Sequence, residues 1–317
     1  MSGSDARPSV TPVALEPTQL IPVEQTAVEL ARAAGSRLWQ RFRSALTIEY
    51  KSPGRQDPVT EADREIERFL REEIRARFPE HGVLGEEGSE PARGAPFVWV
   101  VDPLDGTANF ISGLPLWAVS IGVLWYGRPV AGAIFMSCGP GGGHAVVHAR
   151  LGGGAAQDGE RVQVLAEADP MRRRLATLPA HYWRELRVRY RQPSELGEVR
   201  TLGSVALELA LIAVGVLQYG LFWQPKIWDV AAGAVIVREA GGAVLLHRGW
   251  RKPWTELYAF DPRPTGRGAP PTFRGWRGSI LAGNPGATRT VAGRLRVRLA
   301  AAEPLAAAAR LLVRRGP

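Results

Sequence analysis

A short apolar run leads directly into a turn that carries two carboxylates, and this stretch limits the folds open to the chain more than any other. Residues 97–101 (Phe-Val-Trp-Val-Val) are typical of a strand buried in a sheet, and Pro103 lacks the N–H that a β-ladder needs. The strand is therefore expected to end at Asp102. Asp105 follows three residues later, so both carboxylates and the Leu104 carbonyl oxygen are expected to face one point.

Oxygen ligands arranged in this way suit a hard cation such as Mg²⁺, which takes near-octahedral oxygen coordination at about 2.0–2.1 Å. Gly106 removes a side chain where a ligand must approach, and Thr107 adds a hydroxyl. A plain Asp-Pro turn closed by Asp-Gly explains the same residues, so this stretch alone leaves both interpretations open. The spacing of the aspartates excludes the haloacid-dehalogenase type of site, and the pattern of a calcium EF-hand loop is absent from the sequence.

The composition indicates a globular chain with a basic surface. At 317 residues and 45% apolar content it can form one large domain or two ordinary ones. A formal charge of +9 would favour nucleic acid as a partner, but the excess arginines are scattered along the expected helices and concentrated near the end of the chain, and no aromatic-interleaved basic motif accompanies them. We therefore favour a solvated basic surface over nucleic-acid binding.

The single cysteine and the apolar segments predict a cytoplasmic protein without a membrane anchor. Cys138 alone can form neither an intrachain disulfide nor a cysteine-rich zinc site, which fits a reducing compartment. Residues 1–18 lack the apolar region of a signal peptide. The longest apolar stretch, residues 205–223, is interrupted by Glu208 and Gln218, so it predicts a core helix rather than a membrane span.

Helical and strand patterns place further acidic residues near the central turn. Apolar residues at helical intervals predict helices over residues 22–44 and 60–78, the second beginning with a capping box of Thr60 and Asp63. Asp63 is thereby explained either as a cap or as a site residue. A short strand after His81 runs into Glu86 and Glu87, which are either solvated or part of the same site.

A meander of strands is expected to follow the turn. Residues 117–125 and 128–135 read as strands, and the glycine-rich segment 139–143 predicts a hairpin turn, because it lacks both P-loop and dinucleotide signatures. His144 and His148 are four residues apart, but no third ligand supports a zinc site.

The second half of the chain contributes a third aspartate. We expect a strand over residues 175–178, a helix over 182–190, and a helix over 205–216 that begins at Ser204, which is either only a cap or also a phosphate contact. Asp229 is expected to precede a helix over residues 231–238, again either as a cap or as a ligand near Asp102. Strands are expected over residues 243–247 and 279–282, followed by a helical tail from residue 288.

Three motifs then stand in one order: Glu86-Glu87, Asp102-Pro-Leu-Asp-Gly-Thr107 and Trp228-Asp-Val-Ala-Ala-Gly233. Together they resemble the inositol monophosphatase family of magnesium-dependent, lithium-sensitive phosphatases. The resemblance extends over about residues 27–285 and includes Asp57-Pro-Val-Thr-Glu-Ala-Asp63, Gly203-Ser204 and Glu239-Ala-Gly-Gly242.

The resemblance implies an α/β protein with the layered α+β sugar-phosphatase fold, in which helix and sheet layers alternate and the site lies between two subdomains. We expect a disordered N-terminus over residues 1–20 and an N-terminal metal-binding subdomain over residues 21–165. A C-terminal α/β subdomain then covers residues 166–287, and an Arg/Ala-rich tail covers residues 288–317.

It also implies roles for the acidic residues. Glu86, Asp102 and the Leu104 carbonyl would hold a first Mg²⁺, and Asp102, Asp105 and Asp229 a second. Glu86 would also hold a third ion through water. Two or three such ions would activate a water molecule and neutralise the phosphate oxygens.

The same resemblance implies that Asp63 and Thr107 orient the attacking water, while the backbone N–H groups of Gly106 and Thr107 bind the phosphate. The expected substrate contacts are Asp105, Gly106, Thr107, Gly203, Ser204, Lys51 and Phe222.

Two departures from the family pattern leave the substrate open. Ala108 replaces a second threonine, and Phe222 stands where inositol-specific members carry a sugar-binding acid. Lys226 would instead meet a second anionic group. A small phosphorylated substrate such as inositol 1-phosphate is expected, with sugar phosphates, fructose 1,6-bisphosphate, histidinol phosphate and 3′-phosphoadenosine 5′-phosphate as alternatives. A homodimer, as in many relatives, and a non-catalytic binding member that uses the basic surface are also left open.

Overall fold

The computed structural model describes residues 15–42, 48–50, 58–88, 94–166, 173–179, 186–188, 196–249, 252–266 and 268–297. Lys51, residues 1–14 and residues 298–317 lie outside this part of the chain, so the expectations for them stay predictions. No helix in the described segments combines the length and the apolar character needed to cross a membrane.

The larger sheet has seven strands in the order β3-β4-β5-β6-β7-β8-β9, with β3 and β4 parallel and the remaining neighbours antiparallel. The strands are β3 Gly82–Gly85, β4 Phe97–Asp105, β5 Ala118–Trp125, β6 Arg128–Met136, β7 Ala145–Arg150, β8 Gly154–Gln157 and β9 Glu160–Arg161. The meander after the central turn and the hairpin turn between β6 and β7 are therefore confirmed.

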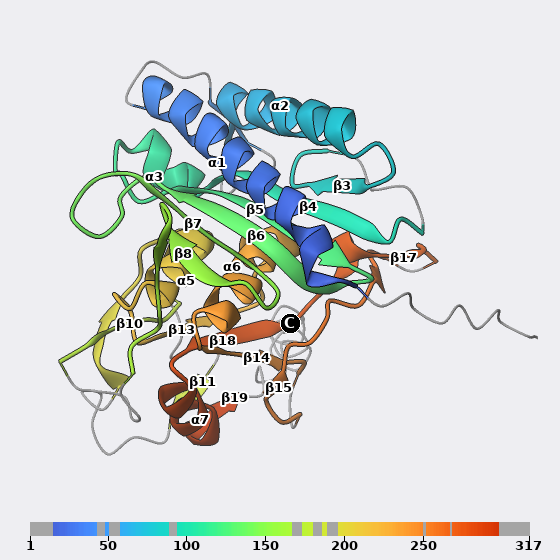
Figure 1. Cartoon of the computed structure of the whole chain (residues 1–317). Coiled ribbons are helices and arrows are strands. Elements are labelled where there is room, and N and C mark those ends of the chain that lie inside the picture. Colours follow the sequence, from blue (N-terminus) through green and yellow to red (C-terminus); the bar gives the residue numbers. More distant parts are fainter. Residues whose placement is uncertain are drawn as a thin grey trace, which may run out of the picture.

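Both faces of this sheet are buried, as its apolar strands require. Val98 and Val100 pack into a cluster with α5 (Val205–Ala213) and α6 (Ile227–Glu239). The alternating residues Trp99 and Val101 point to the other face, where α1 (Ile21–Arg41) and α2 (Glu61–Arg77) cover the sheet (Figure 1).

A second sheet of six strands lies on the far side of α5 and α6, in the order β12-β10-β13-β18-β14-β15. Its strands are β10 Leu175–Thr177, β12 Glu198–Arg200, β13 Tyr219–Phe222, β14 Ala243–His247, β15 Thr255–Glu256 and β18 Ser279–Gly283. The helix α7 (Pro285–Arg294) packs on its outer face through Ala287 and Val291. Helix and sheet layers thus alternate through the molecule (Figure 1), which confirms the layered α/β fold.

The remaining elements are short. They are η1 Pro17–Leu20, β1 Ile48–Tyr50, β2 Pro58–Thr60, α3 Thr107–Ile111, β11 Leu186–Val188, β16 Arg263–Pro264, β17 Pro271–Thr272, η3 Phe273–Gly275 and β19 Leu295–Val297. The division into subdomains at residue 165 stays a prediction.

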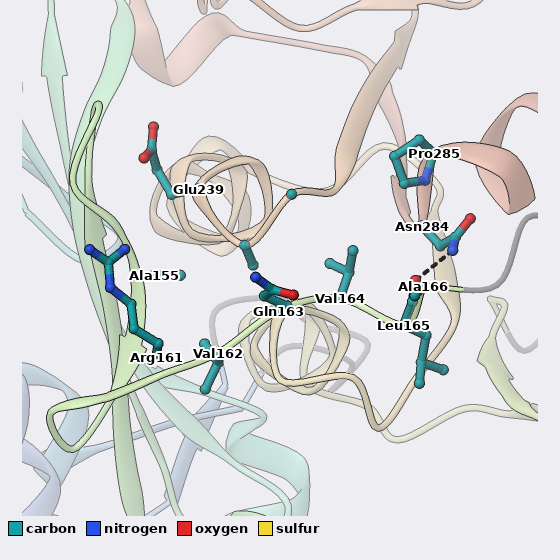
Figure 2. Close-up of a pocket in the computed structure, with 12 residues that line it drawn as sticks. Ala155, Arg161, Val162, Gln163, Val164, Leu165, Ala166, Glu239, Asn284 and Pro285 are labelled. Atoms are coloured by element: carbon teal, nitrogen blue, oxygen red, sulfur yellow. Dashed lines mark hydrogen bonds between the residues drawn. The ribbon is translucent and has the colours of Figure 1, made fainter.

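The segment that leads from the first sheet to the second borders a cavity of about 670 Å³ (Figure 2). In this segment the Val164 N–H donates to the carbonyl of Ala240 at the end of α6. The Asn284 side chain, next to α7, donates to the Leu165 carbonyl. These contacts connect the segment to the end of α6 and to the residue before α7.

Four predicted elements differ from the structure. The strand β4 does not end at Asp102 but continues to Asp105, with a shift of register between the two aspartates. Pro103 is accommodated because a bulge leaves its residue out of the regular ladder. The helix expected over residues 182–190 is wrong where the structure describes it, since residues 186–188 form β11 and pair with β19. The alternation Leu186-Arg-Val188 has the two-residue period of a strand.

The third correction concerns α6, which begins at Ile227 and not after Asp229. Asp229 is therefore the third residue of the helix, and its side chain accepts a hydrogen bond from the Lys226 N–H. The helix expected from residue 288 likewise begins earlier, as α7 at Pro285. It ends at Arg294, and the next three residues form the strand β19.

Two glycines set the distance between α6 and the larger sheet. A Cβ atom on Gly122 would lie 2.7 Å from Ala231 Cβ, and one on Gly132 would lie 2.8 Å from Ala232 Cα. The Ser120 hydroxyl also donates to the Trp228 carbonyl over 3.0 Å. The start of α6, and with it Asp229, is thereby held against β5 and β6.

Candidate functional site

The bulge in β4 and the first turn of α6 bring three aspartates together. Oxygen atoms of Asp102, Asp105 and Asp229 all lie within 4.8 Å of one another. Asp102 is only 2% exposed. The interpretation of this stretch as a plain turn is thus insufficient, because the third carboxylate arrives from the other half of the chain.

Each of these carboxylates has one oxygen fixed by a hydrogen bond. The Leu104 N–H donates to Asp102 Oδ1 over 3.0 Å, and the Lys226 N–H donates to Asp229 Oδ2 over 2.8 Å. Asp105 Oδ2 accepts from Ser204 Oγ and from the Ala206 N–H, both over 2.6 Å. These bonds also fix the direction of the second oxygen of each carboxylate.

The electrostatics of the cluster favour a bound cation. Burial, then the charges of Glu86, Asp105 and Asp229, raise the pKa of Asp102 well above its usual value. Burial, then Asp105, raise the pKa of Asp229 in the same way. Burial raises the pKa of Asp105 to about 6, although Ser204 and the N-terminus of α5 oppose the shift. Oxygen-only ligands with this much unneutralised charge fit a hard divalent ion.

Glu86 is close to this cluster without being one of the three. Its charge contributes to the raised pKa values of Asp102 and Asp229. The loop after β3 therefore brings the charge of Glu86 near the cluster.

The side chains of Asp63 and Thr107 are in contact. Asp63 is 2% exposed in the first turn of α2. Thr107 Oγ1 lies 3.3 Å from Asp63 Oδ1 and 3.0 Å from the Leu104 carbonyl oxygen, and its hydroxyl proton is shared between them. Asp63 therefore does more than stabilise the start of its own helix.

Gly106 connects this pair to the loop before α5. Its φ of +91° is in the left-handed region, and a Cβ atom there would lie 3.0 Å from the Leu116 carbonyl oxygen and 3.1 Å from Ser204 Cβ. The glycine is thus required by both conformation and space. Ser204 is the N-cap of α5, as predicted, since the Leu207 N–H donates to its hydroxyl.

Sequence reasoning missed two residues that hold these loops. The Asn109 amide donates to the carbonyls of Leu116 and Leu202, each over 2.7 Å, which fastens the loop with Gly203 to α3. Glu208 accepts from the Leu202 N–H over 2.7 Å, and burial raises its pKa to about 7. Asn109 follows the central motif by two residues, but nothing in the sequence indicated its distant partner.

Arg274 was also missed, although it holds the loop with Glu86. Its guanidinium donates to the carbonyls of Gly85, Glu86 and Gly88 over 2.5, 3.0 and 2.7 Å. Its Cζ atom lies 5.1 Å from the centre of the Trp228 ring, next to Asp229 in sequence. One arginine thus contacts both segments that bring carboxylates from outside β4.

Phe222 and the two histidines that the sequence singled out contact other parts of the protein. Phe222, at the end of β13, is 3% exposed and belongs to the apolar cluster between the two sheets. His148 Nδ1 lies 2.8 Å from Glu24, and the His144 ring stacks on Phe135. Neither histidine belongs to the metal-ligand group found among the described residues.

Comparison with known proteins agrees with this geometry. The model of the inositol monophosphatase family matches residues 19–269. An inositol-1-monophosphatase of Rhizobium meliloti is 33% identical over 234 residues, which cover 71% of this chain and 86% of that protein. A fructose-1,6-bisphosphatase/inositol-1-monophosphatase of Thermotoga maritima is 31% identical over 218 residues, covering 69% and 82%.

A solved structure shares the fold as well. The extragenic suppressor protein suhB of Bartonella henselae superposes with a TM-score of 0.67 at 28% identity, over 86% of this chain and 98% of the other. The metal-dependent chemistry of the family suits the acidic cluster described above. The chain therefore belongs to the inositol monophosphatase family and is a phosphatase, a hydrolase of phosphoric monoesters.

Proposed function

We propose that this protein is a Mg²⁺-dependent phosphomonoesterase that hydrolyses a small polyol or sugar phosphate. The observation that carries the proposal is the group of three aspartate oxygens within 4.8 Å of one another, with Glu86 close by. Glu86, Asp102, the Leu104 carbonyl, Asp105 and Asp229 would hold two to three Mg²⁺ ions. When bound, these ions neutralise the phosphate oxygens and lower the pKa of a water molecule.

The protein's own groups would position the reactants. In this proposal, the Asp63 carboxylate accepts a proton from the attacking water, which Thr107 Oγ1 orients; the 3.3 Å contact between these side chains supports the pairing. The water oxygen forms the new bond to phosphorus, the ester P–O bond breaks, and the leaving oxygen takes up a proton. Such positioning contributes to the rate because the reacting groups meet in a fixed geometry.

The phosphate would bind at the junction of two loops. In this proposal, the backbone N–H groups of Gly106 and Thr107 donate hydrogen bonds to the phosphate. The loop of Gly203 and Ser204 packs directly against Gly106. Lys51 stays a predicted contact outside the described residues. Phe222 differs, because a buried ring supplies neither a hydrogen bond nor a charge to a substrate hydroxyl.

Two substrate classes follow from these residues. Inositol 1-phosphate is the first candidate, since a relative named inositol-1-monophosphatase is 33% identical to the chain over 234 residues. A sugar bisphosphate is the second, because a relative is named fructose-1,6-bisphosphatase/inositol-1-monophosphatase and Phe222 removes the acid that would bind a ring hydroxyl.

Phosphate release from inositol 1-phosphate, fructose 1,6-bisphosphate, histidinol phosphate and 3′-phosphoadenosine 5′-phosphate tests the proposal. We expect turnover with Mg²⁺ that EDTA abolishes and Li⁺ inhibits. Asp102→Asn should lower kcat at least about a thousandfold, since it removes a ligand shared by two ions. The proposal fails if the folded protein with Mg²⁺ releases no phosphate from any of the four, or if the Asn variant turns over normally.

A further inference from the structure

A second cavity, of about 310 Å³, opens where β13 and β14 end and β18 begins. Its lining includes three arginines, Arg248, Arg263 and Arg277, together with His247. These residues come from three separate segments of the second half of the chain. The larger cavity of Figure 2, by contrast, has one arginine and one glutamate in its lining, Arg161 and Glu239.

The arginines that line this second cavity outnumber the carboxylates that pair with them. Asp261 accepts from both Arg248 and Arg263, with Arg248 Nη1 at 2.6 Å and Arg263 Nε at 3.0 Å. One carboxylate thus serves two guanidinium groups, and these arginines lower its pKa against the effect of burial.

Arg277 adds a third positive charge to the same lining. It donates to the backbone carbonyls of Arg274 and Trp276 over 3.1 and 2.7 Å. Within the described segments, no carboxylate lies at ion-pair distance from it. Three guanidinium groups and one carboxylate leave a net charge of about +2, which matches a dianion of phosphate size.

The cavity lies beside the loop that leads to the acidic cluster. Gln224, in its lining, adopts a left-handed φ of +48°, and its N–H donates to Ser279 Oγ over 3.4 Å. Lys226, whose N–H holds Asp229, is two residues further on. Because Asp229 is five positions after Gln224, their Cα atoms are at most about 18 Å apart. The lining of the cavity and the acidic cluster are therefore joined by one short segment of the chain.

We propose that this arginine-lined cavity binds a phosphate-sized dianion. The dianion is either the second phosphate group of a bisphosphorylated substrate or a separate phosphate-containing ligand. The binding itself does not depend on the proposed function, whereas the first source rests on it. The two parts can therefore fail separately.

Binding is tested with inorganic phosphate on the full chain in EDTA, by isothermal titration calorimetry. We expect saturable 1:1 binding that Arg277→Gln weakens at least about tenfold, because it removes a charged donor. Arg289→Gln is the matched control, since Arg289 is exposed on α7 and its change of charge is the same. Arg263→Gln is a second test, in case Arg277→Gln disturbs the backbone that Arg277 contacts.

Kinetics with Mg²⁺ then separate the two sources. If the cavity holds a second substrate phosphate, Arg277→Gln raises KM for fructose 1,6-bisphosphate about tenfold and leaves KM for inositol 1-phosphate unchanged. If the ligand is separate, KM is unchanged for both while the binding of phosphate is still lost. The proposal is overturned if phosphate does not bind, or if both cavity variants bind it as tightly as Arg289→Gln does. Absence of turnover on either substrate would count against the proposed function and leave the calorimetric test intact.

Discussion

Arg274→Lys tests whether one distant arginine fixes the loop that carries Glu86. The guanidinium donates three hydrogen bonds to the carbonyls of Gly85, Glu86 and Gly88. A lysine keeps the positive charge and its attraction to the Trp228 ring, but a compact ammonium group cannot reproduce the planar fork. We expect it to keep one of the three bonds.

The size of the effect follows from the two lost bonds. A hydrogen bond to a charged group contributes about 1.5–3 kcal/mol, and the side chain is only half-buried, so we take the lower end. Two bonds then amount to about 3 kcal/mol, spread over the loop of residues 85–88 and its contact with α6. If half of this free energy orders Glu86, Mg²⁺ affinity falls by roughly tenfold, the lower end of the range for residues that support metal ligands.

The assay is a Mg²⁺ titration followed by calorimetry or by tryptophan fluorescence. Arg289→Lys serves as control, because Arg289 is exposed on α7. Far-UV circular dichroism should show the same secondary structure in all three proteins. The reasoning is refuted if the folded Arg274→Lys protein binds Mg²⁺ with wild-type affinity.

Three other predictions concern the frame and the carboxylates. Gly122→Ala should cost about 1–3 kcal/mol by forcing α6 from the sheet, whereas Gly143→Ala, in open space, should leave Tm nearly unchanged. Burial raises the pKa of Glu208 to about 7, so the folded state binds its proton more tightly than the unfolded state does. The free energy of unfolding in EDTA should therefore fall between about pH 4.5 and 7, by about 3 kcal/mol more in wild type than in Glu208→Gln; equal pH profiles in urea denaturation would contradict this. Mg²⁺ affinity should drop as pH falls below about 6, because protons then compete for Asp105, whose pKa is about 6; a Kd constant from pH 8 to 5 would exclude this.

The parts of the site that the sequence could predict are those with local signals in a fixed order. Asp102 and Asp105 follow an apolar strand, Asp229 opens a small-residue helix, and Ser204 precedes an apolar run. Each has an ordinary explanation as a turn or a cap residue. Their combination in one order pointed to a family, and the structure places the three aspartates together.

Features that depend on distant backbone atoms could not be predicted. Arg274 contacts carbonyl groups 186 to 189 positions earlier in the chain, and a carbonyl has no side chain that marks it in a sequence. Asn109 reaches Leu202 across 93 positions in the same way. The bulge in β4 was missed because Pro103 ends a regular ladder, while an irregular one tolerates it.

The start of α6 was misjudged for a different reason. An aspartate near a helix start fits the N-cap, but it can also be the third helical residue and accept the N–H of the cap. Asp229 is the third helical residue, and one of its carboxylate oxygens lies within 4.8 Å of oxygens of Asp102 and Asp105.

The position of α6 between the two sheets separates the parts of the site that can change from those that cannot. Ala231 and Ala232 touch the glycines of β5 and β6 on one side, and the second sheet covers the helix on the other. Asp229 therefore cannot shift relative to Asp102 unless α6 moves against a sheet. The packing of the core thus sets the distance between the carboxylates. Ser204 and Lys226 bond to Asp105 and Asp229, whereas residues 223–225 border this frame and hold none of the three carboxylates. Under the proposed function, substitutions at residues 223–225 are expected to alter which phosphate ester is accepted while the acidic cluster keeps its geometry.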